Sequence, residues 1–204
     1  MRIADFDRPD TAAARAALQI ATAYHSPSLL NHVQRSWLWA EGFAAQRGLA
    51  ERADHELLYV SALLHDLGIV PEFDNDTLAY EDAAGHVAIA LTAGAGWEPA
   101  RRTRAHEVIV RHNWPEVDPE LDAEGHLLEI ATALDISGAR VDDLPLEFRR
   151  EVLTEYPRLE LAAEFGACVA DQAERKPDTS ARRLVDGGVQ RKLRDNPLER
   201  ILEG

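Results

Sequence analysis

The chain has 204 residues, 46% of them hydrophobic, and its 36 acidic residues exceed its 22 lysines and arginines to give a formal net charge of −14. This length suits one domain with its own core, and a single cysteine excludes an internal disulfide framework. No run of about 18 apolar residues and no signal-like N-terminal segment is present. The acidic balance disfavours nucleic acid. We therefore expect a cytoplasmic protein that avoids membranes and binds a small molecule.

Apolar residues recur at spacings of three and four almost throughout the chain, a pattern typical of amphipathic helices. Segments 71–77 and 114–122 lack this period and are predicted loops. No linker or internal repeat divides the chain, so we expect an all-α fold with one helical domain over 1–204. The predicted helices cover about 10–24, 26–48, 54–68, 80–93, 99–112, 123–136, 145–156, 158–176 and 178–194.

His65 and Asp66 are adjacent near the end of the predicted helix over 54–68. Three apolar residues precede them and Gly68 follows, so an imidazole and a carboxylate are expected at the buried end of this helix. A buried carboxylate without a partner is costly, and Asp66 therefore needs a cation or several hydrogen bonds. A divalent metal would satisfy both residues. The alternative is a buried His–Asp hydrogen bond that caps the helix.

Two further polar residues interrupt apolar helix faces. His32 follows Leu29, Leu30 and Asn31, and Asp135 lies in an otherwise apolar stretch that would not tolerate a lone charge. Histidines and aspartates on separate helices supply nitrogen and oxygen ligands that can converge on one divalent ion. This distribution favours the metal site over the helix cap.

In these residues the sequence resembles the HD superfamily of metal-dependent hydrolases, whose defining pattern of His, His-Asp and Asp is matched by His32, His65-Asp66 and Asp135. The resemblance implies a compact helical HD-domain bundle, with a metal-site core over about 26–140. It leaves the predicted C-terminal helices, over about 145–204, unexplained. Further blocks look like those of the cyanamide-hydratase-like branch, namely Asn31 to Arg35 with Trp37 and Trp39, 63–68, Tyr80-Glu81, 110–112 and 131–138.

His86 and His112 bear on the number of metal ions. By resemblance, two-metal members of the superfamily hold a second ion with histidines at such positions, whereas single-zinc cyanamide hydratases lack a ligand at the position of His86. His86 is thus expected to bind a second metal or to support the site as a hydrogen-bond donor, with a structural histidine as the alternative. The apolar lead-in to His112 points that helix end inward, and Arg111 is expected beside the site as an anion contact.

We expect an enzyme in which a divalent metal lowers the pKa of a bound water from about 15.7 towards about 7. Asp66 would orient that water or accept its proton. Zinc is the first expectation for the metal, with iron or manganese as alternatives. The candidate ligands are His32, His65, Asp66, His86, His112 and Asp135.

This predicted site is compatible with three alternative reactions and with one non-catalytic role. A cyanamide or nitrile hydratase would use Glu81, Trp37 and Trp39 to line the pocket, and it fits the acidic chain because its substrate is small and uncharged. A phosphohydrolase would use Arg111 or Arg35 on phosphoryl oxygens. The set of six candidate ligands would also permit a di-iron oxygenase. The rival class is a metal-stabilised scaffold or partner-binding module, and exposed apolar positions on the last helices would suit a homodimer.

Overall fold

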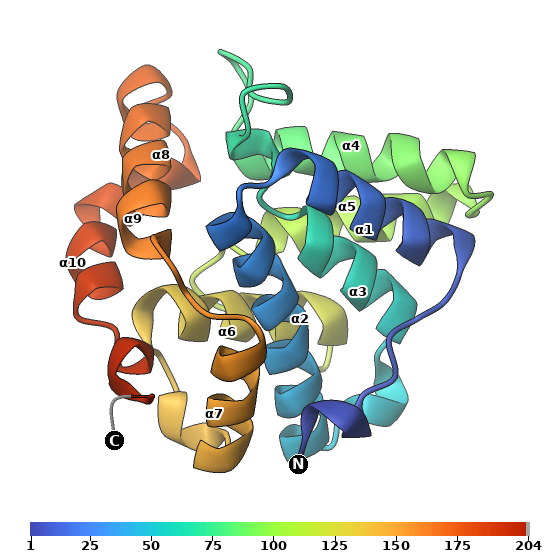
Figure 1. Ribbon diagram of the computed structural model, residues 1–204. Helices are drawn as coiled ribbons and strands as arrows, with labels where there is room; N and C mark the ends of the chain where they lie inside the picture. The colour runs from blue at the N-terminus through green and yellow to red at the C-terminus, as the bar shows by residue number, and fades with distance from the viewer. Residues whose placement is uncertain (203–204) are drawn as a thin grey trace.

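The computed structural model describes residues 1–202, which form ten α-helices and five short 3-10 helices without a strand. The prediction of an all-α fold is therefore confirmed. Figure 1 shows the helices in chain order. They are α1 (Ala12–Tyr24), α2 (Pro27–Arg47), α3 (His55–Leu64), α4 (Tyr80–Gly94), α5 (Pro99–Arg111), α6 (Ala123–Ser137), α7 (Leu146–Glu155), α8 (Leu161–Arg175), α9 (Ser180–Asp186) and α10 (Val189–Arg194), with 3-10 turns η1 (Ile3–Asp5), η2 (Ala50–Arg52), η3 (Leu67–Ile69), η4 (Val141–Asp143) and η5 (Pro197–Arg200).

Helix α2 lies at the centre of the molecule and packs against α3 and α6 (Figure 1). Ser26 caps its first turn by accepting a hydrogen bond from the Leu29 amide, and Gly48 ends it with a left-handed backbone (φ 66°). Its large side chains are buried, and the Trp39 ring meets the edge of Phe148 from α7 at a centroid distance of 5.7 Å. A helix buried on nearly all sides can present polar side chains to an interior site.

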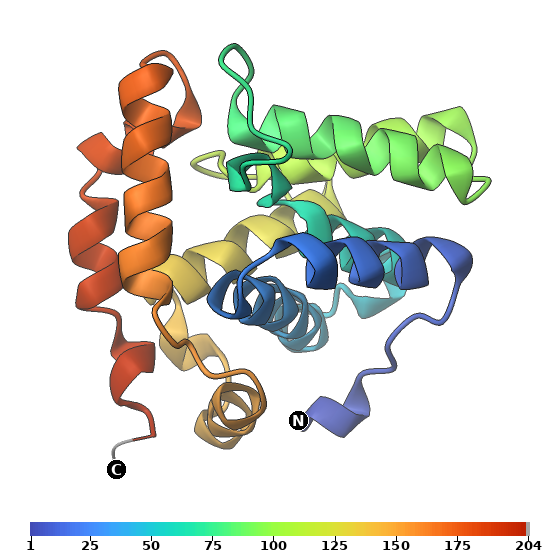
Figure 2. The same ribbon diagram turned by 45° about the horizontal axis from the view of Figure 1, so that its top comes forward.

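The antiparallel helices α4 and α5 form a layer across one side of this core, and α1 packs beside α3 (Figures 1 and 2). Helix α3 ends at Leu64, four residues before the end of the predicted helix, and the chain tightens into η3. This turn brings the backbone of Gly68 against that of Tyr80: a Cβ at position 68 would lie 1.9 Å from the Tyr80 carbonyl oxygen. Glycine is therefore needed where the two segments cross.

The C-terminal helices α8, α9 and α10 form a column on the other side of the molecule (Figures 1 and 2). The predicted single helix over 178–194 is wrong, because the chain breaks at Gly187 and Gly188, and Gly188 has φ 75°. The column is fixed by a second apolar cluster that joins it to the core. This cluster includes Leu29, Ile69, Tyr80 and Ile136 from the core side, and Leu161, Phe165, Val169, Val189 and Leu193 from the column.

Two polar side chains of the C-terminal region also bind the end of α6. Arg158 Nη1 and Asn196 Nδ2 donate to the backbone carbonyl of Asp135, at 2.6 and 2.9 Å. The last carbonyls of a helix have no partner within the helix, so these contacts satisfy a buried acceptor. They tie two distant parts of the chain to one turn of α6.

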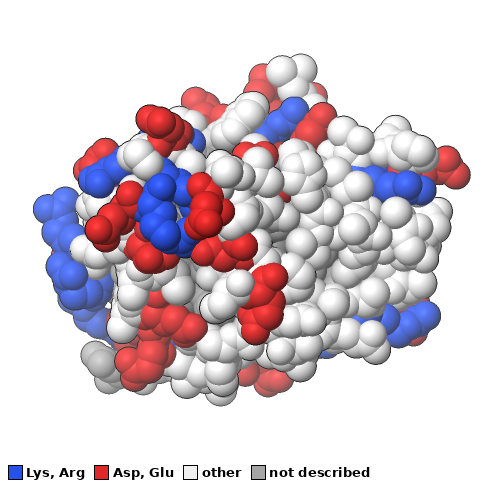
Figure 3. All heavy atoms as spheres, turned by 90° about the horizontal axis from the view of Figure 1, so that it is seen from above, with Lys and Arg blue, Asp and Glu red and all other residues white. Residues whose placement is uncertain are grey.

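Among the described residues, no helix is both long enough and apolar enough to cross a membrane. From above, lysines and arginines gather at the edge formed by α9 and α10 (Figure 3). A mixed cluster lies near the tip of α8, where Arg175 pairs with Asp74, Asp76 and Asp171. The acidic chain thus carries a locally basic edge.

We predict that Gly68→Ala destabilises the protein by about 3 kcal/mol, because the added methyl group meets backbone atoms that cannot rotate away. For a chain of this size, that loss lowers the thermal midpoint by roughly 10 °C. Differential scanning calorimetry measures the change. The matched variant Gly94→Ala, which meets nothing within 4 Å, should be neutral. Equal melting of the two variants would contradict the close approach.

Candidate metal centre

Three side chains converge at the inner ends of α2 and α3. The Nε2 atoms of His32 and His65 lie 3.2 Å apart, and Asp66 Oδ2 lies 3.2 Å from the first and 3.3 Å from the second. One ligand atom from each residue lies within 4.8 Å of the other two. All three residues are buried. The structure thus brings together His32, His65 and Asp66, which were predicted as ligands.

His112 faces the same centre from the end of α5. Its Nε2 atom lies 3.9 Å from Asp66 Oδ1, and its ring centroid lies 4.7 Å from that of His65. Burial lowers the pKa of His112 to about 3, so the imidazole is neutral at neutral pH and keeps a free lone pair. A fourth predicted ligand therefore lies beside the first three.

Each of the three imidazoles has an acceptor on its other nitrogen. His65 Nδ1 lies 2.8 Å from the Ala62 carbonyl, His112 Nδ1 contacts the Ile109 carbonyl, and His32 Nδ1 lies 2.7 Å from Asp135 Oδ2. An Nδ1–H that donates to such an acceptor leaves a lone pair on Nε2.

Ligand atoms thus meet at this centre, where Asp66 Oδ2 lies 3.2 and 3.3 Å from the Nε2 atoms of His32 and His65. Neither carboxylate oxygen of Asp66 has a hydrogen-bond partner among the described residues, although both are buried. A buried carboxylate is unfavourable unless positive charge lies beside it, and a divalent ion among these nitrogens would supply that charge. The donor set therefore fits a divalent metal.

Asp135 does not join this group but lies behind it. Arg35 Nε and Nη2 donate to its two carboxylate oxygens at 2.8 and 2.7 Å, Trp39 Nε1 donates to Oδ1 at 2.8 Å, and His32 contacts Oδ2. Burial alone would raise the pKa of Asp135, but the Arg35 guanidinium holds it well below its usual range. The structure therefore assigns Asp135 to orienting His32 in place of the predicted role of metal ligand.

The same contacts correct the roles expected for Arg35 and Trp39. Both are fully buried and engaged by Asp135, so Arg35 does not reach a substrate phosphate and Trp39 does not line a pocket. Trp37 lies in the core, where its ring packs edge-on against Tyr59 at 5.1 Å.

Three other candidates also lie elsewhere. His86 is exposed on α4, with its ring 5.0 Å from that of His106, and the structure does not bring it to the metal centre. Arg111 pairs with Asp122 at 2.5 Å and with Glu107 at 3.5 Å, so it is not free to hold an anion. Glu81 is buried but does not line the cavity described next, and burial raises its pKa. None of these three side chains lines that cavity.

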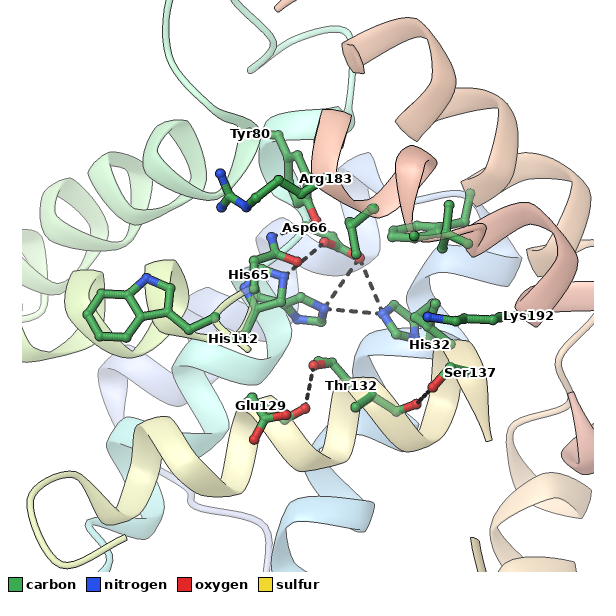
Figure 4. A pocket seen from close by; sticks show the side chains of 18 residues that line it. His32, His65, Asp66, Tyr80, His112, Glu129, Thr132, Ser137, Arg183 and Lys192 are labelled. Atoms are coloured by element: carbon green, nitrogen blue, oxygen red, sulfur yellow. Dashed lines mark hydrogen bonds and ion pairs between the residues drawn. The ribbon is translucent and has the colours of Figure 1, made fainter. Parts of the chain in front are cut away.

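A cavity of about 230 Å³ opens directly onto the metal centre (Figure 4). Polar side chains from α6 form one wall, and Tyr80 with Asn113 forms another. The C-terminal column closes the remaining side. The lining residues beyond the four converging side chains include Tyr80, Asn113, Trp114, Glu129, Thr132, Ala133, Ile136, Ser137, Phe165, Arg183, Leu184, Gly187, Val189 and Lys192.

Most of these lining residues were not predicted. Glu129 and Thr132 could have been predicted as site residues, because they are polar, lie three residues apart and so share one face of an otherwise apolar helical stretch. The loop over 114–122 was expected to wall the pocket, and Trp114 does so, whereas no residue of the loop over 71–77 lines it. Arg183 and Lys192 had no such signal, since a basic run near the end of a helical segment is usually a solvated face.

The HD domain family model matches residues 29–137, more than half of the chain. The chain therefore belongs to the HD domain family, as its His, His-Asp and Asp pattern predicts. Two relatives from Saccharomyces cerevisiae, cyanamide hydratase DDI2 and cyanamide hydratase DDI3, are each 26% identical over 171 residues, which is 83% of this chain and 76% of each relative. The similarity confirms the predicted cyanamide-hydratase-like branch.

Membership of this family makes the protein a metal-dependent hydrolase or hydratase. HD domains bind divalent metals, and the group of His32, His65 and Asp66 could hold one here. The matched segment ends at residue 137, so the C-terminal column that closes the cavity lies outside it.

Asp135→Asn tests the positioning role of this carboxylate. We predict a loss of about 3 to 5 kcal/mol of stability, because Arg35 stays buried without its charged partner. Metal affinity should fall roughly 10- to 100-fold as His32 loses its orientation. Denaturant unfolding and a metal titration measure the two effects.

The matched control is Asp142→Asn, an exposed carboxylate 3.5 Å from Arg149. It should cost less than about 1 kcal/mol and leave metal affinity unchanged. A stable Asp135→Asn variant with full metal affinity would rule out the positioning role.

Proposed function

We propose that this protein is a zinc-dependent hydratase that adds water across the carbon–nitrogen triple bond of a small nitrile or cyanamide. The observation that carries the proposal is the convergence of His32, His65, Asp66 and His112 at the floor of a small cavity. The similarity to two yeast cyanamide hydratases supports the choice of reaction. The cavity is smaller than the roughly 300 to 1,000 Å³ of drug-sized ligand sites, which favours a small substrate.

His32, His65, His112 and Asp66 would hold the ion, and three nitrogens with one carboxylate oxygen suit zinc. When bound, a divalent ion lowers the pKa of water to about 7 and so supplies a nucleophile at neutral pH. Iron and manganese are the other metals that this donor set allows. We also propose a cytoplasmic location, in keeping with the single cysteine.

Hydration moves two protons, and the chain offers groups for both transfers. The oxygen of water bonds to the nitrile carbon, one O–H bond of the water and one C–N π bond break, and a proton must reach the nitrogen. The imidic acid or isourea so formed then tautomerises to the amide or urea. Asp66 accepts the proton that leaves the water, because its carboxylate lies at the metal centre and lines the cavity. Its pKa lies well below the usual range, since the nearby histidines outweigh the upward effect of burial, so it starts ionised.

Glu129 is the group that we assign to the nitrogen. It lines the cavity on α6, opposite Tyr80 in Figure 4, and burial raises its pKa. A carboxyl with a raised pKa is protonated for a larger fraction of the time at neutral pH and can donate to a developing nitrogen anion. Glu129 thus lines the cavity as the carboxyl side chain that Glu81 was expected to provide.

Tyr80 and Thr132 orient the substrate between these two groups. Asn113 Nδ2 donates to the Tyr80 hydroxyl at 2.7 Å, so the phenol proton is free to point into the cavity. Burial raises the pKa of Tyr80 well above its usual value and keeps that proton in place. The Thr132 hydroxyl donates to the Leu128 and Glu129 carbonyls at 3.0 Å, which leaves its oxygen as an acceptor.

The di-iron oxygenase has no support in this arrangement, because His86 and Asp135 do not reach the centre. A phosphohydrolase remains the second candidate, favoured by the two cationic side chains, Arg183 and Lys192, that line the cavity. Substrate tests separate it from the hydratase.

The deciding experiment measures metal content and then turnover of cyanamide, small nitriles and phosphomonoesters in parallel. We expect one zinc per chain and metal-dependent formation of urea or amides. Asp66→Ala should lower kcat/KM at least 100-fold and weaken zinc binding, since it removes a ligand and the proton acceptor together. Asp82→Ala, a carboxylate away from the cavity, is the control and should keep full activity. Turnover of phosphomonoesters alone would remove the hydratase proposal.

A further inference from the structure

Two cationic side chains line the cavity, and both come from the C-terminal column. Arg183 lies on α9 and Lys192 on α10. In Figure 4 the Arg183 side chain passes over Tyr80, and the Lys192 side chain extends from α10 towards His32. Both residues are exposed, so they stand at the mouth of the cavity and not at its floor.

Neither cation has a partner within residues 1–202. No carboxylate lies within ion-pair distance of Arg183 or Lys192 there, and neither side chain makes a hydrogen bond. Neighbouring arginines differ, since Arg182 pairs with Asp186 and Arg175 with three aspartates. In a chain of net charge −14, two unpaired cations at one opening are left available for a ligand.

The charges inside the cavity do not neutralise this pair. Its lining contains two carboxylates, Asp66 and Glu129. Even with both carboxylates ionised, a divalent ion at the metal centre together with Arg183 and Lys192 outweighs them in charge. The metal-loaded cavity is therefore net positive, and a positively charged cleft concentrates anions and speeds their capture.

The size of the cavity adds a second constraint. At about 230 Å³ it holds several times the roughly 30 Å³ that one water molecule occupies in the liquid. A substrate of three heavy atoms, such as cyanamide, would leave most of this space and both cations unused. A longer molecule reaches from the metal centre to the mouth.

From this geometry, and resting on the proposed hydration reaction, we infer that the natural substrate is a small nitrile or cyanamide with an anionic oxygen group at its other end. Arg183 and Lys192 bind that carboxylate or phosphate at the mouth, while the reactive carbon lies over Asp66. The HD segment thus performs the chemistry, and the column outside it selects the substrate.

The test compares 4-cyanobutanoate with pentanenitrile, which has the same length but no charge, on zinc-loaded protein. We expect a higher kcat/KM for the anion. Arg183→Gln and Lys192→Gln should each lower that kcat/KM about tenfold, the size expected for one lost charge-assisted contact. Turnover of pentanenitrile should stay unchanged, and the preference for the anion should fade as ionic strength rises.

Arg191→Gln is the matched control, because Arg191 lies on α10 but does not line the cavity. It should leave both substrates unaffected. A cyanoalkyl phosphate of similar length forms a further arm, and its kcat/KM relative to 4-cyanobutanoate tells which oxyanion is preferred.

Equal kcat/KM values for the charged and neutral nitriles, unchanged in both glutamine variants, would overturn the inference while leaving the hydratase in place. If no nitrile reacts, the proposed reaction fails, and calorimetric binding of 4-cyanobutanoate tests the anion site by itself. Binding that weakens about tenfold in either variant would then support the site. Binding that is absent, or equal in wild type and variants, would overturn it.

Discussion

The buried ion pair between Arg35 and Asp135 is the interaction on which the metal centre depends. Both side chains are fully buried, and each is tolerable there only because the other is present. The guanidinium holds both oxygens of the carboxylate, which in turn meets His32 Nδ1 and so aims His32 Nε2 at His65 and Asp66. The central helix α2 supplies both Arg35 and His32. One helix thus carries an imidazole and the cation that fixes its orientation through a third residue.

Sequence periodicity was enough to predict an all-helical fold, because α2 to α6 follow the apolar spacing closely. It was not enough for the C-terminal column, where two glycines break a continuous helical pattern. A pair of glycines allows a helix to break, but the sequence does not show whether the packing of the folded chain requires a break there. The turn into η3 is similar, since only the contact between Gly68 and Tyr80 requires it.

The residues of the candidate site likewise fall into those that local sequence predicts and those that only tertiary packing places. His32, His65, Asp66 and His112 were predictable because polar residues at the ends or buried faces of apolar helices need partners. Asp135 was recognised as buried, but spacing along a helix cannot tell which nitrogen of His32 it meets. Arg183 and Lys192 lie more than a hundred residues beyond His65 and resemble ordinary surface residues. Their place at the cavity follows from how the column docks, which local sequence does not encode.

The two hydrogen bonds that Arg158 and Asn196 donate to the Asp135 carbonyl have a consequence for biosynthesis. A chain that folds as it leaves the ribosome can bring α2, α3 and α6 together early. The turn of α6 that carries Asp135 stays incompletely bound until Asn196 has also emerged. A chain that ends before Arg158 would therefore leave this carbonyl of α6 without either of its side-chain donors.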